Sequence, residues 1–231
     1  MPIGVFTNVA AVLLGCLCGA PLGKLLPQRV KEALPLAFGA CSIGIGINSI
    51  IKVHSMTPVV LAMLVGLLIG TLIHLEKHTQ QFFRGLVKTL HLGGENVDMD
   101  LYITVVALFC CSGFGWYSVL TEAIAGDPNL LFSKAVLDFF TALVFASTLG
   151  FSTVAIPFPQ IVIFLALFGV GKVLAPFLTD TMFADLSGLG GVLTMCAGFR
   201  VAKIKNMPIV DMMPSLILVM PFSMLWTAIG M

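Results

Sequence analysis

Lys134 and Asp138 are unusual in this sequence because both lie in an apolar run long enough to cross a membrane. Four positions separate them, so they share one face of a helix, one turn apart, and can form an ion pair. A charged side chain at membrane depth is costly without a partner or water, which makes the pair a candidate site for a substrate, ion or proton. The structural alternative is that both stand near a helix start, where the lysine reaches the interface and the aspartate favours the helix dipole.

Other polar residues within or beside apolar segments extend this candidate site. Glu122 lies on the same predicted side of the membrane as the pair. The amides of Asn8, Asn48 and Gln160 each need a hydrogen-bond partner in lipid, and pairing between helices is their structural alternative. The complete set of candidate substrate- or ion-binding residues is Asp138, Lys134, Glu122, Asn8, Asn48, Gln160, Ser112 and Gly113.

Ser112 and Gly113 belong to a run of small residues, Cys-Cys-Ser-Gly-Phe-Gly, in the middle of an apolar segment. Glycine in a membrane helix allows another helix to approach closely. It can also mark a break in the helix, where backbone amides and carbonyls face a ligand. The sequence leaves both interpretations open.

The composition is that of a membrane protein, and these residues must be positioned by membrane-spanning helices. Of 231 residues, 58% are hydrophobic and 10% are charged, against about a quarter charged in soluble domains. Because a span needs about 20 apolar residues, we predict an all-α transmembrane bundle of about eight spans, with seven as the alternative. The spans are expected at 3–23, 32–51, 57–76, 101–125, 133–153, 158–178, 182–202 and 209–230. Asp211 is expected to cap the last helix.

The chain is predicted to form a single transmembrane domain over residues 1–231, organised about a central hairpin. Residues 1–76 form a first unit, and residues 77–100 an interfacial amphipathic helix followed by an acidic loop. Residues 101–154 form the hairpin of spans four and five, and residues 158–231 form the second unit.

The two outer units are predicted to be an inverted repeat. At a constant offset of 152, residues 8–46 match residues 160–198 without a gap and with seven identities, three of them glycines. Spans 1–3 would then correspond to spans 6–8 and run in the opposite sense, a common transporter architecture. Shared Leu- and Gly-rich composition is the alternative explanation.

The distribution of basic residues predicts the orientation of the spans. With eight spans, nine Lys and Arg residues fall on one side and three on the other. The richer side is expected to be cytoplasmic, which places both termini on the non-cytoplasmic side of the membrane.

Several classes of function find no support in the sequence. No nucleophile with a base and no pair of catalytic carboxylates is apparent, so we expect no enzyme, no catalytic residues and no cofactor. All six cysteines lie in apolar runs and are expected to pack as small hydrophobes. No metal site is expected. The net charge of +1 argues against nucleic acid as a partner.

The hairpin sequence resembles a known family. Residues 134–150 read Lys-Ala-Val-Leu-Asp-Phe-Phe-Thr-Ala-Leu-Val-Phe-Ala-Ser-Thr-Leu-Gly, which is similar to the signature of the YqgA-like family of bacterial inner-membrane proteins. The start of the chain, the end of span three, Gly190-Gly191 and the stretch 204–214 resemble it too. The resemblance implies a transporter-like protein of the bacterial inner membrane with no established substrate.

Together these observations predict a secondary transporter or exporter of a small polar solute or ion. Its partners would be the lipid bilayer and that unknown solute, and its small-residue faces allow a homo-oligomer. An ion channel and a non-transporting scaffold or sensor subunit are the alternatives.

Overall fold

The described part of the chain is helical apart from short connecting turns, and it contains no strand. The structure is a computed structural model that describes residues 1–22, 27–89 and 99–229. The α-helices are α1 Ile3–Leu22, α2 Gln28–Ile50, α3 Met56–Leu72, α4 Leu75–Thr89, α5 Met99–Cys110, α6 Gly113–Ala125, α7 Asn129–Leu149, α8 Pro157–Leu174, α9 Asp180–Val201, α10 Ile209–Met212 and α11 Ser215–Ala228. Two short 3-10 helices, η1 Gly150–Ala155 and η2 Ala175–Phe177, follow α7 and α8.

The helices are long and apolar enough to cross a membrane seven or eight times. Seven candidate spans fall within the described residues, two of them built from broken helices: α5 with α6, and α10 with α11. The eighth is α3 with α4, a pair bent by 56°. The all-helical fold and the expected number of spans are therefore confirmed.

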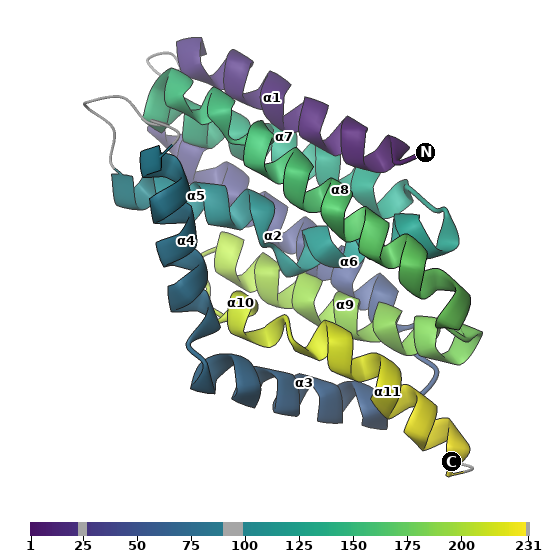
Figure 1. Cartoon of the computed structure of the whole chain (residues 1–231). Coiled ribbons are helices and arrows are strands. Elements are labelled where there is room, and N and C mark those ends of the chain that lie inside the picture. Colours follow the sequence, from purple (N-terminus) through teal and green to yellow (C-terminus); the bar gives the residue numbers. More distant parts are fainter. Residues whose placement is uncertain (23–26, 90–98, 230–231) are drawn as a thin grey trace.

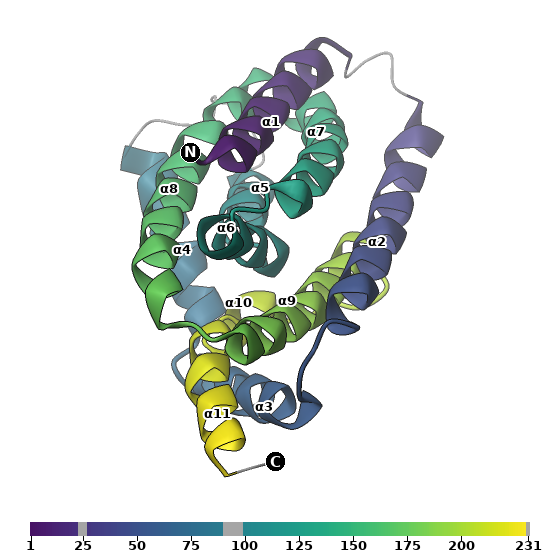
Figure 2. The same cartoon turned by 90° about the vertical axis from the view of Figure 1, so that its right-hand side faces the viewer.

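The spanning helices lie side by side, and α5 and α6 occupy the middle of the bundle (Figures 1 and 2). The α5–α6 span is 78% buried inside the protein, whereas the α8 span is 22% buried. Irregular backbone at membrane depth is tolerated only where protein or water covers it, so a broken span belongs in the centre. Both ends of the chain lie at the same end of the bundle (Figure 1).

Helix α4 runs across the opposite end of the bundle (Figure 1), and the chain bends by 56° between α3 and α4. It is amphipathic: Phe83 and Val87 are buried against α5, while Phe82 is exposed. The helical part of the predicted interfacial segment is thus present. Most of the predicted acidic loop, at residues 90–98, lies outside the described residues.

Helices α2 and α9 cross through two glycine contacts. A Cβ added at Gly46 would lie 2.6 Å from the Gly191 carbonyl oxygen, and one at Gly191 would lie 2.6 Å from the Gly46 carbonyl oxygen. Gly39 and Gly198 meet in the same way. Small residues at these positions let the two backbones touch.

This contact predicts that alanine is tolerated at one of two neighbouring glycines and not at the other. Gly46→Ala should destabilise the protein by about 1–3 kcal/mol, because the new methyl group would have to push a backbone oxygen aside. Gly44→Ala is the matched control, since a Cβ there meets nothing within 4 Å. Thermal unfolding of the two variants in detergent measures the difference; equal melting temperatures would contradict the close crossing.

Candidate functional site

The Lys134–Asp138 pair is formed and is buried in the bundle. The Lys134 ammonium group binds the Oδ2 atom of Asp138 on the adjacent turn of α7. The structural alternative required the Lys134 side chain to reach the water at the membrane interface. Lys134 is only 2% exposed, so its side chain does not do so. The i, i+4 spacing predicted this contact, and burial strengthens it because the surroundings screen the charges poorly.

Two amides extend the pair across three helices. The Asn8 amide nitrogen on α1 donates to Asp138 Oδ2 at 2.9 Å. The Gln160 amide nitrogen on α8 donates to the Asn8 side-chain oxygen, also at 2.9 Å. Asn8 and Gln160 are fully buried, so these bonds satisfy groups that would otherwise be costly to bury. We call Asn8, Lys134, Asp138 and Gln160 the polar network.

Part of the polar network has no partner among the described residues. The Oε1 atom of Gln160 is buried and forms no hydrogen bond. Both hydrogen bonds to Asp138 reach Oδ2, and the Asp138 side chain keeps 12% of its surface exposed. The network therefore retains acceptor capacity for a proton, a water molecule or a solute.

Glu122, near the end of α6, contacts the start of α1 and is not part of this network. Its carboxylate accepts hydrogen bonds from the backbone amides of Gly4, at 2.6 Å, and Val5, at 3.2 Å. These are among the first amides of α1, which have no partner within their own helix. The buried negative charge of Glu122 is thus balanced by backbone donors and by the positive end of the helix dipole.

Ser112 and Gly113 mark a break in the central span, and Gly113 also allows close packing. Ser112 separates α5 from α6 and caps α6 by accepting a hydrogen bond from the Gly115 amide at 3.0 Å. Gly113 serves close packing, since a Cβ there would lie 2.9 Å from Leu193 Cβ. A Cβ on Gly115 would lie 2.9 Å from Lys134 Cε, so the lysine side chain passes directly over the break.

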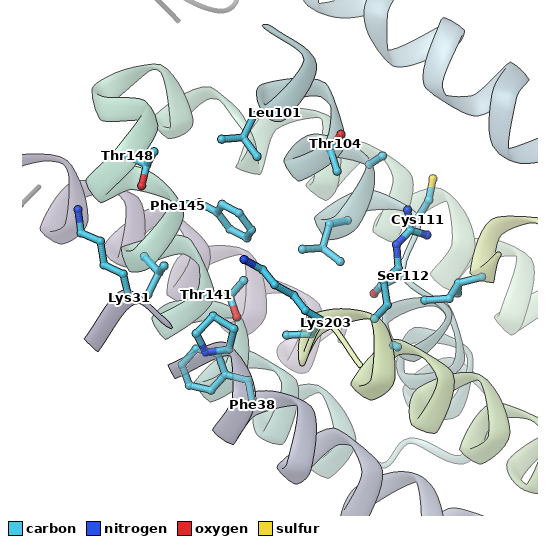
Figure 3. Close-up of a pocket in the computed structure, with 18 of the residues that line it drawn as sticks. Lys31, Phe38, Leu101, Thr104, Cys111, Ser112, Thr141, Phe145, Thr148 and Lys203 are labelled. Carbon is cyan, nitrogen blue, oxygen red and sulfur yellow. The ribbon is translucent and has the colours of Figure 1, made fainter. Parts of the chain in front are cut away.

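A cavity of about 710 Å³ leads from one end of the bundle to this break. Its mouth lies among the first turns of α2 and α4 and the last turns of α7 and α9, and Ser112 and Thr141 lie deep within it (Figure 3). Thr141 is three residues from Asp138 on α7, so the deep part of the cavity lies one turn from the polar network.

The structure brings together only part of the predicted site. Asn8, Lys134, Asp138 and Gln160 form one hydrogen-bonded network, and Ser112 lies close to it. Asn48 does not join them, because it is exposed on α2 and hydrogen-bonds through its side chain to none of the described residues.

Two further polar groups have partners that the sequence did not indicate. Asp185 on α9 is buried and accepts hydrogen bonds from the amides of His54 and Ser55, at the start of α3, and from the Ser223 hydroxyl group. Arg200 pairs with Glu76 at 2.8 Å beside the cavity mouth. An acidic residue in an apolar segment, Asp185, was the one available signal.

The prediction that Asp211 caps the last helix is wrong. Its carboxylate accepts a hydrogen bond from the Glu76 amide at the start of α4, at 2.7 Å. Helix α11 has Pro214 at its N-cap position and no side-chain cap. Asp211 therefore caps α4, a helix distant in sequence, by accepting from a first-turn amide that has no partner within its own helix.

These features define a multi-pass helical membrane protein with a buried ion pair beside an open cavity. The chain matches the family described as "Protein of unknown function (DUF554)" over residues 3–224 and belongs to that family. It is 39% identical over 235 residues to the uncharacterized protein YqgA of Escherichia coli (strain K12), an alignment that covers 99% of both chains.

A second relative is more distant. The chain is 27% identical over 152 residues to the uncharacterized membrane protein YdfK of Bacillus subtilis (strain 168), which covers 64% of this chain and 63% of YdfK. No solved structure matches the chain significantly.

Because the pair is buried, we expect removal of one charge to destabilise the protein more than removal of both charges. Lys134→Met should destabilise the protein by about 3–5 kcal/mol, because it leaves the Asp138 carboxylate buried without its cation. Lys134→Met combined with Asp138→Asn should recover most of that loss. Lys172→Met is the control, because Lys172 is exposed near the end of α8. Thermal unfolding in detergent gives the comparison; a harmless Lys134→Met would show that the pair is not buried in solution.

Proposed function

We propose that this protein is a secondary transporter, or exporter, of a small polar solute across the bacterial inner membrane. The observation that carries the proposal is the cavity of about 710 Å³ that opens at one end of the bundle and stops at a helix break one turn from a buried ion pair. Broken helices beside charged groups at mid-depth are a recurring design of transporter binding sites.

The cavity mouth is assigned to the cytoplasm on the basis of charge. Among the described residues, that end of the bundle carries Arg29, Lys31, Lys77, Arg84, Lys88, Arg200, Lys203 and Lys205. The opposite end, where both termini lie (Figure 1), has Lys52 and Lys172. The excess of cations favours a cytoplasmic mouth and non-cytoplasmic termini.

The arrangement of the two outer units supports an inverted repeat. Helix α2 starts at Gln28 and α9 at Asp180, while α1 ends at Leu22 and α8 at Leu174; both pairs of positions differ by 152. The members of each pair run in opposite directions (Figure 1). The helix boundaries therefore agree with the same offset as the sequence match, which shared composition alone does not explain.

The contacts between the units support it further. At an offset of 152, Gly39 corresponds to Gly191 and Gly46 to Gly198, while the observed contacts are Gly39 with Gly198 and Gly46 with Gly191. Such an exchange of partners is what a two-fold relation requires. Asn8 corresponds to Gln160, and these two side chains bond to each other, as expected for residues beside the axis.

Close packing on the far side favours a transporter over an open channel. On that side, Gly190 of α9 packs directly against the Tyr117 ring of α6, and Glu122 joins α6 to the start of α1. In an inverted repeat, the alternate state exchanges the roles of the two halves. The proposed cycle therefore opens this side while the cytoplasmic mouth closes.

In this cycle, Asp138 is proposed to sense the bound ion or proton. Its Oδ2 atom is the acceptor for both the Lys134 ammonium group and the Asn8 amide. A proton or cation on this carboxylate weakens both bonds, which changes how α7 is held against α1. The ion-dependent step would thus act on the contact between the central hairpin and the first repeat unit.

Cysteine accessibility along α7 tests the proposed pathway. In a protein lacking the six native cysteines, single cysteines at Thr141, Phe145 and Thr148, which line the cavity, should react with a membrane-impermeant thiol reagent added from the cytoplasmic side. Cysteines at Ala142 and Ala146, which are buried, should remain unlabelled.

Two other outcomes would reject the proposal. Protection of all five positions would mean that no hydrated pathway exists, as expected of a scaffold. Labelling of Thr141 together with ion conductance that does not saturate with concentration would instead identify a channel.

A further inference from the structure

The cavity holds an excess of positive charge. Its charged lining residues are three cations and two carboxylates: Lys31, Arg200, Lys203, Glu32 and Glu76. Glu76 is neutralised by Arg200 at 2.8 Å. Glu32 accepts a hydrogen bond from Gln28 at 2.8 Å on the first turn of α2, so it lies at the mouth rather than at depth.

Lys203 directs its side chain into the cavity. Lys203 is an exposed residue just after the end of α9, and its side chain extends toward the side of the cavity where Phe145 and Thr141 also line the wall (Figure 3). Among the described residues, the Lys203 ammonium group forms no ion pair and no hydrogen bond. A cation in this position is available to a bound anion.

The backbone at Lys203 is held in a conformation that suits another residue type. Its φ of +57° lies in the left-handed region, where glycine and asparagine are favoured over residues such as lysine. The turn is fixed by hydrogen bonds from the amides of Lys203 and Ile204 to the carbonyls of Arg200 and Phe199. A lysine is uncommon at such a position, and its side chain therefore merits a test.

The rest of the cavity wall is largely apolar. The rings of Phe38 and Phe145 and the side chains of Leu108, Val201 and Ile209 contribute to it. A volume of about 710 Å³ is within the range of pockets that bind small organic molecules. A bare inorganic ion would leave most of this surface without a partner.

Deep in the cavity, the field also favours a negative charge. Ser112 is the N-cap of the 13-residue helix α6 and lines the cavity, so the positive end of this helix dipole lies there. Lys203 and the positive end of the α6 dipole therefore both favour a negatively charged group in the cavity.

We propose that the cavity binds small organic anions that combine one acidic group with an apolar body, and that Lys203 is the residue that binds the acidic group. This inference rests on the proposed transport function and names its substrate class.

Three probes of similar shape and different charge test it: benzoate, benzyl alcohol and benzylammonium. The readout is the labelling rate of the native Cys111, which lines the cavity, measured by mass spectrometry on the full-length protein in detergent. Benzoate should protect Cys111 at the lowest concentration, and benzylammonium should protect it least.

Matched variants test whether Lys203 is the cation that binds benzoate. Lys203→Asn keeps a residue type that tolerates the left-handed backbone and should weaken protection by benzoate about tenfold, as expected for loss of one charge-assisted bond. Lys205→Asn is the control, because Lys205 is exposed and does not line the cavity. It should bind benzoate like the wild type.

The outcomes separate this inference from the proposed function. Equal or better protection by benzylammonium, unchanged benzoate protection in Lys203→Asn, or no protection by any probe would each overturn the anion assignment. If cysteines at Thr141 and Phe145 were still labelled from the cytoplasm, the pathway itself would stand. Protection of those cysteines from the reagent would remove the pathway and the anion site together.

Discussion

The architecture depends on one buried carboxylate, Asp138. A charge at this depth is tolerated only with a cation and hydrogen-bond donors around it, and three helices supply them. Lys134 comes from the same helix, Asn8 from α1, and Gln160 reaches Asn8 from α8. Helix α1 can supply its amide because Gly15 and Gly19 let it lie directly against the backbone of α7.

The same principle holds at the helix ends. Glu122, Asp185 and Asp211 each accept a hydrogen bond from the first backbone amides of another helix, at α1, α3 and α4 respectively. A protein with few charged residues thus uses acidic side chains to satisfy amides that have no partner in their own helix. These contacts fasten the bundle at defined points, while the cavity between α2, α7 and α9 remains open at one end.

The sequence was sufficient for features that depend on local spacing. Hydropathy located the spans, the i, i+4 spacing predicted the Lys134–Asp138 pair, and the apolar periodicity indicated the amphipathic helix that became α4. Gly126, with φ of +73°, ends α6 within the interval left between the predicted spans 101–125 and 133–153.

Features that depend on distant partners could not be predicted. Asp211 caps α4 rather than its neighbouring helix, and Asp185 serves the start of α3, because any unpaired amide nearby in space can take the cap. Asn48 was expected to face the site but is exposed on α2. In each case the spacing along the chain carried no information about which helices meet.

We propose that Asp138 couples its own charge to the opening of the cavity. Pulsed electron spin resonance on lipid-embedded protein tests it directly, with spin labels at Gln28 on α2 and Thr148 on α7, two exposed positions that line the cavity. The account predicts two distance populations in the wild type and a clear change in their ratio in Asp138→Asn. A single distance population, identical in both proteins, would contradict it.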